Sequence, residues 1–166
     1  MAPLDRLAAG HRLCLHWAGR LQAGTATATG DQAAALLACL DEAAPGQQAV
    51  EAGCLFPALI EAMAGSDARC LRQMTQALAA DQQRLQSLWR RLRPSLVLAP
   101  GAAGPPLPVA DAAAAAAAAA ADLRAFAALQ TAHSQRMLAE LLPMAGRLLD
   151  DAALARIGQA LQARRL

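Results

Sequence analysis

The stretch Glu51-Ala52-Gly53-Cys54-Leu55-Phe56-Pro57-Ala58-Leu59 places a single carboxylate at the head of an apolar run, within a longer helical pattern. That pattern starts at Asp31, a good helix N-cap residue, and continues to about Ala64. Pro45-Gly46 predicts a bend inside it, because proline lacks an amide hydrogen and glycine loosens the backbone. We therefore expect Glu51 to lie on a long, bent second helix.

Helical periodicity continues on both sides of this segment, and the alternation typical of strands is absent. Apolar residues recur at spacings of three and four, which is the pattern of helices that bury one face. The other predicted helices are about Leu4 to Gln22, Asp67 to Arg93 with Pro94 as its stop, Asp111 to about Leu149, and a short C-terminal helix that Asp150 or Asp151 caps and that ends near Arg165.

These elements predict an all-α fold, an up-down-up-down four-helix bundle with a short C-terminal helix. A chain of 166 residues suits one domain, so residues 1–166 are expected to form a single bundle. Residues 94–110 are rich in proline and glycine, which predicts a long crossover loop between the third and fourth helices.

Composition narrows the classes of function. A net charge of +2 gives no basic surface for nucleic acid, so we expect no nucleic-acid partner. Asp5 and Arg6 argue against a secretory signal, and no run of about 18 uncharged apolar residues suggests a membrane span. The four cysteines show no CxxC spacing, which favours free thiols and a cytoplasmic location. The serines lack a His/Asp pattern for nucleophilic catalysis, so we expect no enzyme.

The predicted helices carry polar residues inside otherwise apolar faces. His11 lies between Leu7 and Cys14 on the first helix, and Gln82 interrupts the apolar stripe of the third. His133 occupies the same kind of position on the fourth helix. Inward-facing polar side chains are how helical bundles build cofactor sites, although a hydrogen-bonded polar core has the same pattern.

The segment around Glu51 resembles bacterial hemerythrin-like (HHE) proteins, which carry a Glu before "LFPAL". The upstream sequence Ala44-Pro45-Gly46-Gln47-Gln48-Ala49-Val50-Glu51 is similar to the family's Ala-Pro-x-His-His-x-x-Glu, with glutamine in place of both histidines. Ala9-Gly10-His11-Arg12-Leu13 is similar to its first-helix Cys-His-x-x-Ile. The resemblance implies that His11 and Glu51 occupy metal-ligand positions and that Gln47 replaces a ligand histidine.

The resemblance extends to the third and fourth helices. Asp81-Gln82-Gln83-Arg84-Leu85 is similar to the family's Glu-His-x-x-Leu, so Gln82 stands where a ligand histidine is expected. His133-Ser134-Gln135-Arg136-Met137, followed by Leu141-Leu142-Pro143, resembles its His-x-x-x-Glu before Leu-Leu-Pro. The family position of a bridging carboxylate therefore holds Met137. The resemblance implies a hemerythrin-like protein with a degenerate di-iron site that does not bind oxygen at a di-iron centre.

Several alternatives remain open for the retained residues. His11, Glu51 and His133 could serve a mononuclear metal-binding or redox-sensing protein, because two histidines and one carboxylate form the ligand set of mononuclear non-haem iron sites. Soft atoms of Cys14, Cys54 and Met137 could instead favour Cu(I). Without metal, both histidines could be satisfied by Gln47 and Gln82 in a polar core. A protein-interaction module that uses Arg90, Arg91 and the crossover is another possibility. The expected cofactor is thus none or one metal ion, with iron favoured, and oligomeric state is not indicated.

Overall fold

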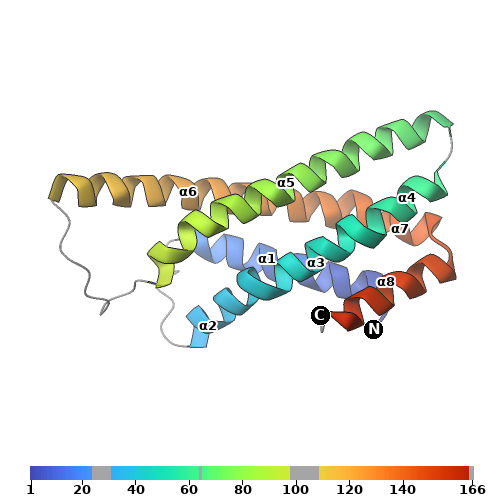
Figure 1. Cartoon of the computed structure of the whole chain (residues 1–166), viewed down its shortest axis with the longest axis horizontal. Coiled ribbons are helices and arrows are strands. Elements are labelled where there is room, and N and C mark those ends of the chain that lie inside the picture. The colour runs from blue at the N-terminus through green and yellow to red at the C-terminus, as the bar shows by residue number, and fades with distance from the viewer. Residues whose placement is uncertain (24–30, 64, 98–108, 165–166) are drawn as a thin grey trace.

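The computed structural model describes residues 1–23, 31–63, 65–97 and 109–164. Within these ranges nearly every residue is helical and none forms a strand, which confirms the predicted all-α class. Long helical segments lie along one axis of the molecule (Figure 1). Among the described helices, none is both long and apolar enough to cross a membrane.

The helix bounds agree with those predicted from the sequence to within a few residues. Two of the long segments are single helices interrupted by short π-helical turns, in which the hydrogen bonds span one extra residue. The elements are α1 (Pro3–Gln22), the segment α2 (Asp31–Ala38), η1 (Cys39–Ala43), α3 (Ala44–Val50), η2 (Glu51–Leu55) and α4 (Phe56–Ala62), then α5 (Gly65–Val97), the segment α6 (Val109–Arg136), η3 (Met137–Leu141) and α7 (Leu142–Leu148), and finally α8 (Asp151–Ala163).

The predicted stop at Pro94 is wrong, because α5 continues through it to Val97. Pro94 lies in the last turn and is exposed, so it removes only one hydrogen bond near a helix end where carbonyls can bond to water. The fourth helical segment also begins slightly early, at Val109. The predicted crossover over residues 94–110 is thus helical at both of its ends, and its middle, residues 98–108, lies outside the described residues.

Each of the three π-helical turns ends two residues before a proline. The amide hydrogens of Ala44, Phe56 and Leu142 bond the carbonyl oxygens of Cys39, Glu51 and Met137, five residues back. The next residue in each case is proline, which has no amide hydrogen and whose ring would collide with the carbonyl four residues earlier. The wider turn relieves this collision without ending the helix. The π-helical turn η1 thus lies directly before Pro45-Gly46, where the sequence predicts a bend.

The interior consists of two apolar clusters separated by polar side chains. The leucine cluster comprises Leu7, Val50, Leu55, Phe56, Leu59, Leu71, Leu78, Met137, Leu141, Leu142, Ala145, Ile157 and Leu161. The tryptophan cluster comprises Cys14, Trp17, Ala18, Leu21, Leu36, Cys39, Leu40, Leu85, Trp89, Leu92, Phe126 and Ala127. A polar layer contains the buried residues His11, Gln47, Glu51, Gln82, Gln130, His133 and Ser134; along the chain, all of these but Glu51 fall between a member of one cluster and a member of the other.

Candidate metal centre

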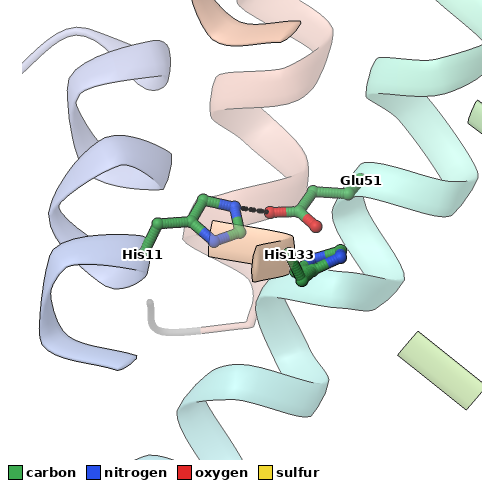
Figure 2. A group of neighbouring side chains, drawn as sticks. All are labelled: His11, Glu51 and His133. Atoms are coloured by element: carbon green, nitrogen blue, oxygen red, sulfur yellow. Dashed lines mark hydrogen bonds and ion pairs between the residues drawn. The ribbon is translucent and has the colours of Figure 1, made fainter. Parts of the chain in front are cut away.

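Three separate helical segments bring His11, Glu51 and His133 together in the polar layer (Figure 2). His11 comes from α1, Glu51 is the first residue of η2, and His133 lies near the end of α6. Their exposed fractions are 2%, 0% and 1%, so water has almost no access to them. One ligand atom from each residue lies within 4.8 Å of the other two. The sequence-predicted trio is thus a compact, buried group.

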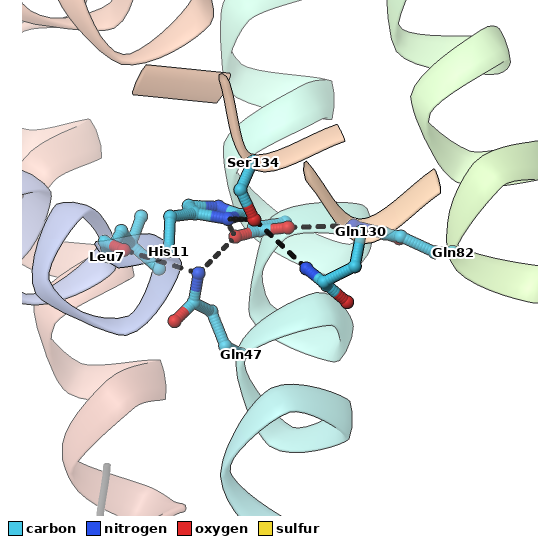
Figure 3. Close-up of polar contacts among 7 residues, drawn as sticks. Leu7, His11, Gln47, Gln82, Gln130 and Ser134 are labelled. Carbon is cyan, nitrogen blue, oxygen red and sulfur yellow. Dashed lines mark hydrogen bonds and ion pairs between the residues drawn. The ribbon is translucent and has the colours of Figure 1, made fainter. Parts of the chain in front are cut away.

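The carboxylate of Glu51 is the hub of the hydrogen bonds, and its partners His11, Gln47 and Gln82 are labelled in Figure 3. Gln47 donates its side-chain amide to Oε1 at 2.8 Å, and Gln82 donates to Oε2 at 2.7 Å. His11 Nε2 lies 2.7 Å from Oε1 and completes the set of donors. Three donors from three helices therefore fix the position of one buried carboxylate, which offsets part of the cost of removing it from water.

A second chain of hydrogen bonds orients His11 from its other side (Figure 3). Gln130 donates to the hydroxyl oxygen of Ser134 at 2.9 Å, and that oxygen lies 3.4 Å from His11 Nδ1. In a neutral ring, Nε2 carries the proton toward Glu51 and Nδ1 accepts from the serine hydroxyl. Every polar atom of His11 therefore has a partner, and the ring is held in one orientation.

The position of Gln47 depends on a glycine in the neighbouring helix. Its amide nitrogen also donates to the carbonyl oxygen of Leu7 at 3.3 Å, in the first turns of α1. A Cβ atom added at Gly10 would overlap Oε1 of Gln47. Gly10 is thus the residue that lets the glutamine side chain lie against the backbone of α1.

His133 has the opposite environment from His11. Neither Nδ1 nor Nε2 of its ring has a hydrogen-bond partner, although both atoms are buried. Burial lowers the pKa of His133 to about 4, an effect that the nearby Glu51 carboxylate opposes and that the His11 ring reinforces. The ring is therefore neutral at pH 7, with one nitrogen bearing a proton and the other a lone pair that can bind a cation. Unpartnered buried nitrogens are rare in folded proteins and call for an explanation.

This group could hold one metal ion. Imidazole nitrogen and carboxylate oxygen bind a cation at roughly 2.0–2.2 Å, so atoms on one coordination sphere lie about 3–4 Å apart. Ligand atoms now within 4.8 Å of one another need to approach by only about 1 Å, which side-chain rotations can provide. Gln47 and Gln82 would hold the carboxylate from outside such a site, as hydrogen bonds to ligating groups commonly do.

The other candidate residues have different surroundings. Gln47 and Gln82, the glutamines at family ligand positions, contact Glu51 and direct their amides at it rather than at a histidine. Met137 is fully buried and belongs to the leucine cluster. Cys14 lies in the tryptophan cluster and Cys54 packs partly buried against the leucine cluster. Neither thiol belongs to the compact group of possible ligands found among the described residues.

Sequence reasoning missed three residues that shape the centre. Gly10 appeared only as a neighbour of His11, and Gln130 and Ser134 had no assigned role. Gln130 lies three residues before His133 on a buried face, so its helical spacing alone could have indicated a place in the polar layer. The contact between Ser134 and His11 depends on how α1 and α6 pack, which the pattern of a single helix does not encode.

A cavity of about 370 Å³ lies beside the polar layer. Its apolar wall includes Leu85, Trp89 and Phe126, and its polar lining includes Gln48 and Gln130. Gln130 in the cavity wall donates to Ser134, and Ser134 in turn contacts His11. These two side chains connect the cavity to a candidate ligand. An ion could approach the buried group from this side.

Comparison of the chain with protein-family models, with curated proteins and with solved structures finds no match in any of the three.

Proposed function

We propose that this protein binds one divalent metal ion, with iron(II) favoured, through His11, Glu51 and His133. The observation that carries the proposal is that both buried ring nitrogens of His133 lack a partner, while one of them lies within 4.8 Å of ligand atoms of Glu51 and His11. Two histidines and one carboxylate suit iron(II), and three protein ligands leave coordination positions open. A bound ion would give one of the two ring nitrogens of His133 a partner.

Charge supports the same proposal. Glu51 is fully buried, and its nearest donors are two neutral amides and one imidazole. An isolated buried carboxylate is costly, and a divalent cation would compensate its charge more completely than amide dipoles do. Binding through His11 Nε2 would place the ring proton on Nδ1, where the Ser134 hydroxyl oxygen can accept it. Protons compete with a metal ion for imidazole nitrogen, so metal affinity should fall at low pH.

We further propose that the chain is a hemerythrin-like up-down-up-down bundle whose di-iron centre has been reduced to a single site. The contacts of Gln47 and Gln82 with Glu51 support this reading, because both glutamines stand at family histidine positions and reach the same centre. Amides are poor ligands, and Met137 supplies no carboxylate bridge. A second iron would therefore lack most of its ligands, and oxygen binding at an iron pair is not expected.

The strongest rival is a metal-free polar core. It accounts for Glu51, His11, Gln47 and Gln82, whose polar atoms toward the centre have partners. It does not account for His133, because a core selected for stability alone would have little reason to retain an imidazole with both nitrogens unsatisfied. The contrast between the two histidines is the reason to prefer a metal site.

Metal stoichiometry and thermal stability test the proposal together. The chain is purified without chelator or affinity metal, loaded anaerobically with ferrous iron, and analysed for bound iron and for melting temperature. We expect one iron per chain, no oxo-bridged absorption bands in air, and a stabilisation of about 2.7 kcal/mol when free iron is about 100 times the dissociation constant. His133→Leu should abolish both effects, whereas His16→Gln, which changes an exposed histidine, should leave them intact.

Three results would contradict the proposal. A folded protein with neither stoichiometric iron nor an iron-dependent melting shift would leave only the polar core. Two irons per chain with oxo-bridged bands would show that the glutamine and methionine substitutions do not disable the second site. Tight zinc binding without iron binding would overturn the choice of metal while retaining the three ligands.

A further inference from the structure

The cavity of about 370 Å³ beside the polar layer extends from the surface into the interior. Its mouth is where the exposed side chains of Gln86 and Arg90 lie, and its walls include the buried side chains of Trp89 and Phe126. Small-molecule sites usually have volumes of roughly 300–1,000 Å³. The cavity is therefore large enough for a small ligand.

Two aromatic side chains form much of its apolar wall. The rings of Trp89 and Phe126 lie with their centroids 5.8 Å apart and their planes inclined by 39°. Asp41 accepts the indole hydrogen of Trp89 at 2.8 Å, which fixes the orientation of this ring. An oriented aromatic wall favours another flat ring, because aromatic rings attract one another in offset and tilted arrangements.

The charged residues near the mouth favour an anion. Nε of Arg93 lies 2.9 Å from both carboxylate oxygens of Asp41, so these two opposite charges are already paired. Arg90 donates to the hydroxyl of Ser87 at 3.3 Å, and no ion pair among the described residues includes it. The lining thus carries one uncompensated positive charge, on a guanidinium group that is well suited to bind a carboxylate.

The inner end of the cavity has free polar atoms on two buried glutamines. Gln48 accepts from Gln86 through Oε1, and Gln130 donates to Ser134 through Nε2. In the part of the chain that the structure describes, Gln48 Nε2 and Gln130 Oε1 have no partner, yet neither is fully enclosed. Since the two residues are only 8% and 3% exposed, the cavity is where solvent reaches these atoms. A ligand that displaces this solvent must replace its hydrogen bonds.

We propose that this cavity binds a small aromatic carboxylate with a hydroxyl group on its ring. The ring lies against Trp89 and Phe126, and the carboxylate pairs with Arg90 at the mouth. The hydroxyl group accepts from Gln48 and donates to Gln130. The inference does not depend on the proposed metal, since none of these residues belongs to the group of candidate ligands.

Calorimetric titration of the metal-free chain, in the presence of chelator, tests the proposal with three matched probes. In 4-hydroxyphenylacetate all the recognised groups are present, phenylacetate lacks the hydroxyl group, and tyramine has an ammonium group in place of the carboxylate. We expect one 4-hydroxyphenylacetate per chain with a dissociation constant below about 1 mM. Phenylacetate should bind about tenfold more weakly, because the buried glutamine atoms lose their partner, and tyramine should not bind.

The comparison of probes uses the wild-type chain, so it does not depend on the folding of any variant. If 4-hydroxyphenylacetate did not bind, or if tyramine bound as tightly, the proposal would be wrong.

Substitutions then test where the ligand lies. Arg90→Gln should weaken 4-hydroxyphenylacetate about tenfold. Arg84→Gln, which changes an exposed arginine of the same helix outside this cavity, should leave the affinity unchanged. Gln48→Leu should remove most of the preference for 4-hydroxyphenylacetate over phenylacetate, because the hydroxyl group loses its donor. Unchanged affinity in Arg90→Gln, together with an unchanged preference in Gln48→Leu, would place the ligand elsewhere and overturn the proposal.

Discussion

The leucine cluster and the polar layer lie one helical turn apart but are stabilised in different ways. Leu7 precedes His11 on α1 by four residues, and Leu78 precedes Gln82 on α5 by the same spacing. In the leucine cluster, contacts are non-directional and depend on volume, so shape-conserving changes are tolerated. In the polar layer, each donor is aimed at a particular acceptor. Loss of one acceptor there leaves several buried groups unsatisfied at once.

A second contrast lies within the polar layer itself. His11 has a partner at each ring nitrogen, whereas His133 has none. Hydrogen bonds thus satisfy the polar atoms of Glu51 and His11, whereas the ring nitrogens of His133 have no partner. A purely structural polar core would be more stable if His133 had hydrogen-bond partners. Their absence is therefore evidence that bears on function.

The largest expected effect comes from removing the hub of the polar layer. Glu51→Ala deprives His11, Gln47 and Gln82 of their common acceptor and should lower the free energy of unfolding by about 3–5 kcal/mol. Urea denaturation of metal-free protein measures this loss. The matched change in the leucine cluster, Leu78→Met, conserves volume and should cost less than about 1.5 kcal/mol. Equal losses of unfolding free energy in the two variants would contradict the claim that the polar layer and the leucine cluster are stabilised in different ways.

The next effect is a pH dependence that belongs to His133. Its pKa is about 4 in the folded protein and near 6.5 when unfolded, so the unfolded chain binds the extra proton between these values. Stability is therefore fully present above pH 6.5 and declines as the pH falls toward 4, by on the order of 3 kcal/mol. Unfolding curves across this range, in the presence of chelator, measure the decline.

Two variants isolate this contribution from that of the carboxylates. His133→Leu should lose the decline between pH 6.5 and 4, whereas His16→Gln should keep it, because His16 is exposed. Parallel pH curves for wild type and His133→Leu would mean that His133 is solvated or hydrogen-bonded in solution. The argument for a metal at that position would then lose its main support.

Much of this architecture could be predicted from single-helix patterns. Spacings of three and four residues located the helices and placed His11, Gln82 and His133 on buried faces. Capping chemistry marked the start of α8, where the Asp150 side chain accepts from the Ala153 amide at 2.7 Å. The proximity of His11, Glu51 and His133 was implied by a family resemblance. The bundle topology and the family itself stay predictions.

What could not be predicted depends on how helices rotate and approach one another. The amides of Gln47 and Gln82 could have turned to the histidines, and only the packing directs them to Glu51. The π-helical turns before Pro57 and Pro143 depend on local sequence, but a proline can also end a helix. The apolar residues after each proline favour continuation of the helix.

The smallest effect is also the sharpest test of directional packing in the polar layer. Gly10→Ala adds a methyl group where Gln47 lies, so the glutamine must leave its bonds with Leu7 and Glu51. We expect a net loss of about 1 kcal/mol, because overpacking and lost hydrogen bonds exceed the gain in helix propensity of alanine over glycine. In a Gln47→Ala background the obstacle is absent, and the same Gly10→Ala change should stabilise the protein by about 0.5–1 kcal/mol. Urea denaturation of the four proteins in this cycle measures the reversal of sign. If Gly10→Ala had the same effect in both backgrounds, Gln47 would be free to move away from α1, and the carboxylate of Glu51 would not be held as tightly as its hydrogen bonds indicate.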